Sequence, residues 1–269
     1  VHTFIMEAFR VGGAKEGEMD KMKQWLLKQK QTQMWESTHA TIDAIYALLS
    51  QGSDWFSSEG ETRVTLGNRL VEAEKSELGT GYLKDSWSHA EIAPEMGRVT
   101  VTHKGEGPAW GALYWQYYED LDKIIQYGAS LDIGKQLFVE QTDSTGISLI
   151  RIVEDTPLTV GDKVVARLVV RTDRDLEFVH LKDMYAAAFE PVSQISGTGW
   201  QNGILYYRTS KDASTNFYFD VLPRGTYVFE YAMIVGRSGA YSNGITTLQC
   251  LYAPEFNSHS AGIRIIVKQ

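Results

Sequence analysis

Side chains that could act as metal ligands or phosphate-binding groups are scattered through this sequence of 269 residues. The histidines stand far apart in the chain, and none forms a His-x-x-x-His pair or lies beside a cluster of carboxylates: 2, 39, 89, 103, 180 and 259. A zinc site needs three or four such ligands at defined spacings. The sequence also lacks Gly-x-Ser-x-Gly and a Gly-rich phosphate loop. It therefore predicts neither a zinc centre nor a hydrolase.

Cys250 is the single cysteine of the chain, which excludes an internal disulfide and a cysteine-rich metal site. It stands in the run Leu248-Gln249-Cys250-Leu251, which has the pattern of a strand. A free cysteine in such a run usually packs as a small hydrophobic residue. We therefore expect a buried and unreactive thiol.

Two further groups of residues raise the possibility of a binding site. Asp173, Asp175 and Glu177 alternate on one strand face, and carboxylates are calcium ligands. Arg174 interrupts them and no Gly-turned loop follows, so we expect a solvated face. Aromatic residues that could stack on sugars are expected in the interior or at domain interfaces instead: Asp54-Trp55-Phe56, Trp87 and Trp200.

Composition narrows the classes of protein further. The formal net charge of −8 and the pI of about 5.3 argue against nucleic acid or anionic membranes as partners. No apolar run reaches the roughly 18 residues that a membrane span requires. The chain opens with Val1 and lacks a basic leader region before Arg10. We therefore expect a piece of a longer polypeptide, with no membrane span and no cofactor.

The first 50 residues have helical periodicity. Met19, Met22 and Leu26 recur at helical spacing, and Ser37 is a suitable N-cap for a second helix. A link over residues 31–36 would join the two as a helical hairpin. We expect Met22, Leu26, Ile45 and Leu49 to pack between the helices. The opposite sides should stay under-covered, because two helices have too few neighbours to bury both apolar faces.

From Trp55 onward hydrophobic residues recur at every second position, as in a strand, and no longer at the spacing of a helix. Alternating segments predict strands at residues 62–66, 99–103 and 109–118, and residues 119–130 form a connector with helical tendency. Residues 131–269 then contain about nine strand-like segments at regular spacing: 136–140, 148–153, 163–172, 178–182, 205–209, 216–221, 226–235, 246–252 and 263–267. The fold class expected is α+β, mainly β, with a helical hairpin followed by antiparallel sandwiches.

Two stretches of the chain resemble bacterial alpha-2-macroglobulins. One is Leu222-Pro223-Arg224-Gly225-Thr226-Tyr227, followed by a Gly-rich loop, Tyr252-Ala253-Pro254-Glu255 and a last β run. The other is Asp173-Arg174-Asp175-Leu176-Glu177-Phe178-Val179, which leads through Leu181-Lys182-Asp183 to Glu190-Pro191. Alanines 186–188 replace the proline and glycine that the family often has there.

The resemblance implies a division of the chain into three parts. Residues 1–52 would be the end of a thioester-type helical domain, the α-toroid of the family. Residues 53–119 would be part of a CUB-like β domain whose other strands lie upstream. Residues 131–269 would be a macroglobulin-type β-sandwich, equivalent to the receptor-binding domain.

The resemblance also implies a function for the parent protein, which is the trapping of proteases. Family members use a Cys-x-Glu-Gln thioester, but here Phe138 occupies the cysteine position before Glu140 and Gln141, so no thioester can form in this segment. The segment would be a non-catalytic scaffold that packs on the upstream thioester domain and keeps water away from it. Its partners would be upstream domains of the same chain and, through the parent, target proteases. The setting implied is periplasmic or the cell surface.

The Gly-rich loop over residues 236–244 is a candidate contact surface toward the thioester domain. Glycines such as Gly239 permit close approach of another surface, and Tyr241 and Arg237 offer an aromatic and a charged group. A solvated hairpin with an incidental tyrosine remains the alternative. A second function class also stays open: a β-sandwich binding module for carbohydrate or a protein partner, which exposed tryptophan rows on one face would favour.

Overall fold

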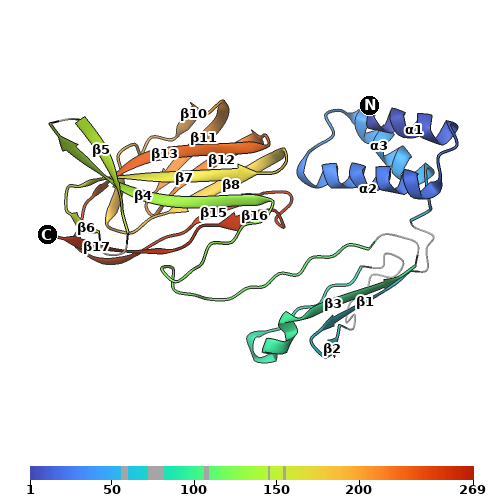
Figure 1. Ribbon diagram of the computed structural model, residues 1–269, viewed down its shortest axis with the longest axis horizontal. Helices are drawn as coiled ribbons and strands as arrows, with labels where there is room; N and C mark the ends of the chain where they lie inside the picture. Colours follow the sequence, from blue (N-terminus) through green and yellow to red (C-terminus); the bar gives the residue numbers. More distant parts are fainter. Residues whose placement is uncertain (56–59, 72–81, 106–108, 145, 154–155) are drawn as a thin grey trace. The chain divides into compact units, whose positions relative to one another are not determined.

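The computed structural model describes residues 1–55, 60–71, 82–105, 109–144, 146–153 and 156–269. Three helices open the chain and almost entirely antiparallel sheets follow (Figure 1), which confirms the α+β, mainly β fold class. The chain divides into two compact units, residues 1–26 with 36–113 and residues 27–35 with 114–269. None of the helices in the described ranges has the length and apolar character needed to cross a membrane.

The helical segment contains one helix more than predicted. The helices are α1 (His2–Val11), α2 (Glu16–Thr32) and α3 (Thr38–Ser50). A turn at Gly12 and Gly13 separates the first two, and Gly13 has a φ of 82°, a conformation that glycine adopts without steric cost. The predicted N-cap of α3 is confirmed, because the Ser37 side chain accepts a hydrogen bond from the Ala40 amide at 3.2 Å.

The helices share only a small core. Met6, Met19 and Ala47 are buried together, and Leu26 is also buried, as predicted. The prediction was wrong for Ile45 and Leu49, which are 46% and 60% exposed. Alanines of α3 take the inner positions instead, because their short side chains let the helices approach closely. The expected under-covered sides are confirmed by exposed apolar residues on all three helices: Phe4, Phe9, Val11, Trp25, Ile42, Tyr46 and Leu49.

A polar contact holds the chain that leaves α3 against α2. Lys23 is almost completely buried, donates to the Ser53 carbonyl at 2.8 Å and lies 4.2 Å from the centre of the Trp55 ring. Asp20 accepts from the Ser53 amide at 3.0 Å and from its hydroxyl at 2.6 Å. Trp55 therefore packs on a cation, which stabilises the ammonium where burial lowers its pKa.

A three-stranded antiparallel sheet follows in the order β2 (Arg69–Leu70), β1 (Glu61–Leu66) and β3 (Val99–Lys104), which confirms the first two predicted strands. Short 3₁₀ turns, η1 (His89–Glu91) and η2 (Pro94–Gly97), precede β3. The predicted strand at 109–118 was wrong: these residues have no regular structure, and their large side chains are exposed. Aromatic alternation alone does not make a strand, because a strand also needs a neighbour for its backbone hydrogen bonds.

The terminal part of the chain is a β-sandwich (Figure 1). One sheet has the order β5 (Gly146–Arg151), β4 (Leu131–Asp143), β7 (Lys163–Thr172), β13 (Gly225–Val235) and β9 (Phe189–Pro191). The other has the order β10 (Gly197–Gln201), β11 (Ile204–Lys211), β12 (Ser214–Leu222), β8 (Leu176–Met184), β15 (Thr246–Cys250) and β16 (Asn257–His259). A third, small sheet has the order β14 (Gly239–Asn243), β17 (Ile263–Lys268) and β6 (Pro157–Thr159).

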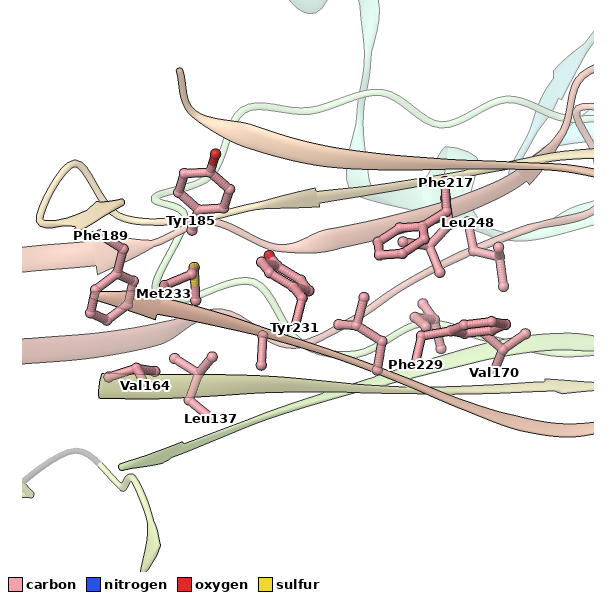
Figure 2. Packing of buried hydrophobic residues seen from close by; sticks show 14 of the residues in the cluster. Leu137, Val164, Val170, Tyr185, Phe189, Phe217, Phe229, Tyr231, Met233 and Leu248 are labelled. Carbon is pink, nitrogen blue, oxygen red and sulfur yellow. The ribbon is translucent and has the colours of Figure 1, made fainter. Parts of the chain in front are cut away.

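The main core lies between the two large sheets, where inward residues of alternating strands meet. Figure 2 shows Phe217 and Leu248 facing Phe229 and Val170 across the interior. The centres of the Phe217 and Phe229 rings are 5.9 Å apart, within the range of favourable aromatic pairs. All nine strands predicted within residues 131–269 are present, and their inward positions supply most of this core. The strands that were not predicted are short: β6, β9, β10, β14 and β16.

The connector before the sandwich forms a turn rather than a helix, so its predicted helical tendency was wrong. It docks on the strands near the end of the chain: Asp122 pairs with Arg264 at 3.1 Å, and the Gly262 amide donates to the Ile124 carbonyl at 2.8 Å. A Cβ at Gly262 would lie 1.8 Å from the Leu121 carbonyl oxygen, so only glycine fits there. The helical pattern was overridden by this close tertiary contact.

Candidate functional site in the terminal sandwich

The three predicted contact residues lie at or beside β14. The prediction of a loop over residues 236–244 was wrong in part, because Gly239–Asn243 pairs with β17 in antiparallel register. Arg237 and Gly239 are exposed, whereas Tyr241 is half-buried and packs against the main core. Pairing with β17 satisfies backbone groups that a loop would leave to water, which is why this Gly-rich segment is a strand.

Tyr241 lies back over the chain instead of projecting from it. Its hydroxyl donates to the Ser238 carbonyl at 2.8 Å. A Cβ on Gly239, which has a φ of 143°, would lie 3.0 Å from the Tyr241 hydroxyl oxygen. The ring therefore covers the glycine, and the start of β14 is held in one conformation.

A buried ion pair stands behind this strand, between the two large sheets. Lys135 comes from β4 and Asp183 from β8, and Lys135 Nζ lies 2.6 Å from Asp183 Oδ1. Neither side chain has any solvent exposure. Burial of two opposite charges is costly unless their remaining hydrogen-bonding positions are also filled.

Those positions are filled. Asp183 accepts from the Tyr231 hydroxyl through Oδ2 and from Thr246 Oγ1 at 2.6 Å through Oδ1. Lys135 Nζ also donates to the Met184 carbonyl at 2.6 Å and to the Gly244 carbonyl at 3.0 Å. Burial lowers the pKa of Lys135, and burial together with the Asp183 carboxylate raises the pKa of Tyr231 well above its usual value. Tyr231 is therefore a neutral hydrogen-bond donor.

The same cluster anchors the end of β14. Asn243 is fully buried, accepts from the Ala186 amide at 3.1 Å and donates to the Gly244 carbonyl at 3.2 Å. A Cβ on Gly244 would lie 2.4 Å from that of Met184, so the chain approaches β8 too closely for any larger residue. The candidate contact strand is thus fixed at both ends, by Tyr241 and by the buried pair.

This cluster was not predicted from the sequence, although the sequence contains a signal for it. Lys135 is the polar member of the inward-facing series 131, 133, 135, 137 and 139, in which the other positions are apolar. Asp183 shares the inward phase of Val179 and Leu181, and Tyr231 shares that of Phe229. A charged residue at an inward strand position predicts a buried partner, although it does not identify that partner.

Two hollows adjoin the sandwich. One, of about 150 Å³, lies beside Tyr231 and is lined by Val192, Ser193, Arg208, Ser210, Thr215, Tyr231 and Ala232. Thr215 Oγ1 is buried and has no hydrogen-bond partner among the described residues. The other, of about 500 Å³, is open, and its lining includes Arg171, Arg224, Asp132 and Asp173.

The remaining candidate residues are buried or paired with neighbouring side chains of the sandwich. Cys250 is buried as predicted, and burial raises the pKa of its thiol to about 11. Phe138 lies in β4 with its ring under the Arg167 guanidinium, 4.6 Å away. The Asp173 carboxylate pairs with Arg174 at 2.8 Å. Within the described ranges, no three His, Cys, Asp or Glu side chains come together as a metal site.

The aromatic candidates for sugar stacking divide into two kinds. Trp55 packs on Lys23, and Trp87 lies 5.8 Å from the Arg69 guanidinium. Trp200 is 70% exposed and pairs with Leu205 on the outer face of the six-stranded sheet, so of the two expected places the interior of this sandwich is excluded and a domain interface stays a prediction. Phe56 lies outside the described residues.

Comparison with known proteins gives several matches. Residues 131–255 match the family described as the bacterial alpha-2-macroglobulin MG10 domain. A curated relative, circularly permutated Ras protein 2 of Dictyostelium discoideum, is 24% identical over 114 residues, which is 41% of this chain and 3% of that protein.

Solved structures of two bacterial proteins also resemble the chain. Trypsin-activated alpha-2-macroglobulin from Escherichia coli matches with a TM-score of 0.49 and 12% identity, over 100% of this chain and 18% of that one. Salmonella alpha-2-macroglobulin reacted with methylamine matches with a TM-score of 0.44 and 15% identity, over 88% of this chain and 15% of that one. The chain thus spans less than a fifth of the length of each. The likeness to bacterial alpha-2-macroglobulins therefore rests on residues 131–255, which match the family's MG10 domain.

Proposed function

We propose that this chain is a non-catalytic part of an alpha-2-macroglobulin-like endopeptidase inhibitor that traps its target proteases. The observation that carries the proposal is the match of residues 131–255 to the MG10 domain of that family. Cleavage of a bait segment and acylation of the protease by a thioester would take place in upstream domains. The parent protein would act in the periplasm or at the cell surface.

The three-part organisation follows from the same proposal. Residues 1–52 complete a helical thioester-type domain, residues 53–119 contribute to a CUB-like domain, and residues 131–269 form the macroglobulin sandwich. The apolar faces left exposed on α1 and α3 support the first assignment. The unpaired aromatic segment at 109–118 supports the second, because strands from elsewhere in the parent would supply its hydrogen bonds.

Within the parent, the sandwich shields the thioester domain from water, and the surface of Arg237, Gly239 and Tyr241 is the proposed contact. Arg237 is exposed and the strand that follows it is rigidly anchored. A pre-ordered surface loses little conformational entropy when a partner packs on it. Shielding matters because a thioester in bulk water hydrolyses.

The test follows the release of free thiol from the full-length parent. Tyr241→Ala should accelerate thioester hydrolysis, because the cover over Gly239 is lost. Tyr227→Ala is the matched control: this ring also covers a glycine, Gly225, and its hydroxyl also donates to a nearby carbonyl, at Pro223, 2.9 Å away. Equal rates for the two variants would show that Tyr241 does not shield the thioester.

A second function has one observation in its favour. The outer face of the six-stranded sheet carries exposed apolar and aromatic side chains, in the cross-strand pairs Trp200 with Leu205 and Tyr207 with Tyr218. Such a row suits a β-sandwich module that binds carbohydrate or a protein partner. Titration with polysaccharides, followed by tryptophan fluorescence, tests this function. A response that Trp200→Ala abolishes and Trp110→Ala preserves would support it, and no response would exclude carbohydrate.

A further inference from the structure

We propose that Lys135 and Asp183 are joined by an isopeptide bond, formed without an enzyme once the sandwich has folded. The bond would link Lys135 Nζ to Asp183 Cγ and so connect the two large sheets covalently. The reacting groups are already in contact, with Nζ 2.6 Å from Oδ1, and both side chains are fully excluded from solvent. This modification is independent of the proposed trapping function.

The surroundings of Lys135 favour a nucleophilic amine. Water normally keeps a lysine protonated by solvating its charge, and that solvation is absent here. Burial accordingly lowers the pKa of Lys135, which increases the fraction of neutral amine. The carbonyl groups of Met184 and Gly244 accept two N–H groups, at 2.6 and 3.0 Å. When the amine is neutral, its two N–H groups are used by these carbonyls. Its lone pair is then directed toward Asp183, the third contact of Nζ.

The surroundings of Asp183 favour attack at its carboxyl carbon. The Tyr231 hydroxyl donates to Oδ2, and Thr246 Oγ1 donates to Oδ1 at 2.6 Å. Donors placed at a carboxyl oxygen stabilise the negative charge that develops there during acyl transfer. Because the pKa of Tyr231 is raised well above its usual value, this hydroxyl keeps its proton throughout.

The reaction is a condensation that needs no other reactant. A proton first passes from the Lys135 ammonium to Asp183 Oδ1, which gives a neutral amine and a neutral acid. Nζ then attacks Cγ, and negative charge develops on Oδ2, opposite the Tyr231 hydroxyl. The bond from Cγ to Oδ1 breaks, and Oδ1 leaves as water with the transferred proton and a second proton from the amine. No atom is oxidised or reduced.

The released water has a place to go. The hollow of about 150 Å³ beside Tyr231 has room for water, and its wall includes the buried Thr215 hydroxyl, which lacks a partner among the described residues. Once the water has left the buried site, it is no longer available to reverse the condensation.

The chain contains its own control for the role of burial. Lys123 Nζ and Asp120 Oδ2 lie 2.7 Å apart, nearly the distance of the buried pair, but both side chains are 67% exposed. Water keeps that amine charged, so no bond should form there. Contact alone is therefore insufficient, and the proposal depends on the dry site.

The test is the mass of the purified protein, unfolded in acid and measured intact. The expected result is a mass lower than that of the sequence by one water molecule. Tryptic digestion should then yield one branched peptide that joins Lys135 to Asp183 and is uncut after Lys135. The full sequence mass, with separate peptides for these two residues, would overturn the proposal and leave an ion pair only.

Variants sharpen the test. Lys135→Met should abolish the loss of water, whereas Lys123→Met should leave it unchanged. Tyr231→Phe keeps the ring and removes only the donor, and it should slow the mass change after refolding about 100-fold. A mass change of the same size in Lys135→Met would place the dehydration elsewhere and overturn the assignment.

Discussion

The helical segment and the terminal sandwich each bury one lysine, and they do so by different means. In the helices, Lys23 donates to the Ser53 carbonyl and packs against Trp55. In the sandwich, Lys135 contacts a carboxylate at 2.6 Å and two carbonyls. The negative charges of Asp20 and Asp54 also favour the Lys23 ammonium. A lysine between two sheets needs a counter-ion, because no water reaches it.

The same difference appears in the apolar residues. The sandwich fully buries Phe217, Phe219 and Phe229, whereas the helices leave Phe4, Phe9 and Trp25 exposed. The described residues of the sandwich therefore form a self-contained core, and those of the helices do not. This difference predicts that substitutions with similar chemistry will have unequal effects in the two regions.

The largest effect is expected for the buried pair. Asp183→Ala leaves the Lys135 amine buried without its carboxyl partner, removes the proposed cross-link as well, and should lower the free energy of unfolding by at least about 3–5 kcal/mol. Urea unfolding followed by tryptophan fluorescence measures this change. Asp120→Ala, at the exposed pair with Lys123, should have no measurable effect. A small effect at Asp183 would show that its contact with Lys135 does not stabilise the sandwich.

Replacing one phenylalanine in each region tests the difference in burial between the sandwich and the helices. Phe229 is fully buried, whereas Phe9 is half exposed. Phe229→Ala removes a ring from the core and should lower the free energy of unfolding of the sandwich by about 3–5 kcal/mol. Phe9→Ala should scarcely change the melting of the helices, measured by circular dichroism. Equal losses would mean that the helical face is not under-covered.

The connector supplies a smaller effect. Gly262→Ala forces a methyl group against the Leu121 carbonyl and should cost about 1–3 kcal/mol. Hydrogen exchange of the Gly262 and Tyr127 amides should accelerate, since both bond across this contact. Gly197→Ala, where a Cβ would meet nothing within 4 Å, is the control. Unchanged exchange in Gly262→Ala would show that the connector adapts freely.

The smallest effect concerns the Cys250 thiol. Burial raises its pKa from the reference value of 9.0 to about 11, so alkylation by iodoacetamide should be slow at pH 8 in the folded protein and fast in urea. Below the thiol pKa of the unfolded chain, the neutral thiol makes its full contribution to the stability of the folded state. That contribution is lost as the pH rises from about 9 to about 11. Rapid alkylation of folded protein at pH 8 would contradict the burial of this residue.

Local patterns predicted much of the fold because they depend on near neighbours in the chain. Alternation of apolar residues identified the nine longer sandwich strands, and Ser37 marked the start of α3. β10 and β14 have five residues each, as does the predicted β15, but glycines and polar residues interrupt their apolar pattern. The strand expected at 109–118 failed because pairing depends on a neighbour that the local pattern cannot supply.

By itself, the sequence determined that this segment contains no thioester, because Phe138 has no sulfur. The apolar alternation around Lys135 and Asp183 indicates inward positions, although the strands predicted at 136–140 and 178–182 left both residues out. Only the tertiary structure decided that these two residues meet, because their strands belong to opposite sheets. It likewise decided that Tyr241 lies back over Gly239, since the direction of a side chain depends on the surface that packs beneath it.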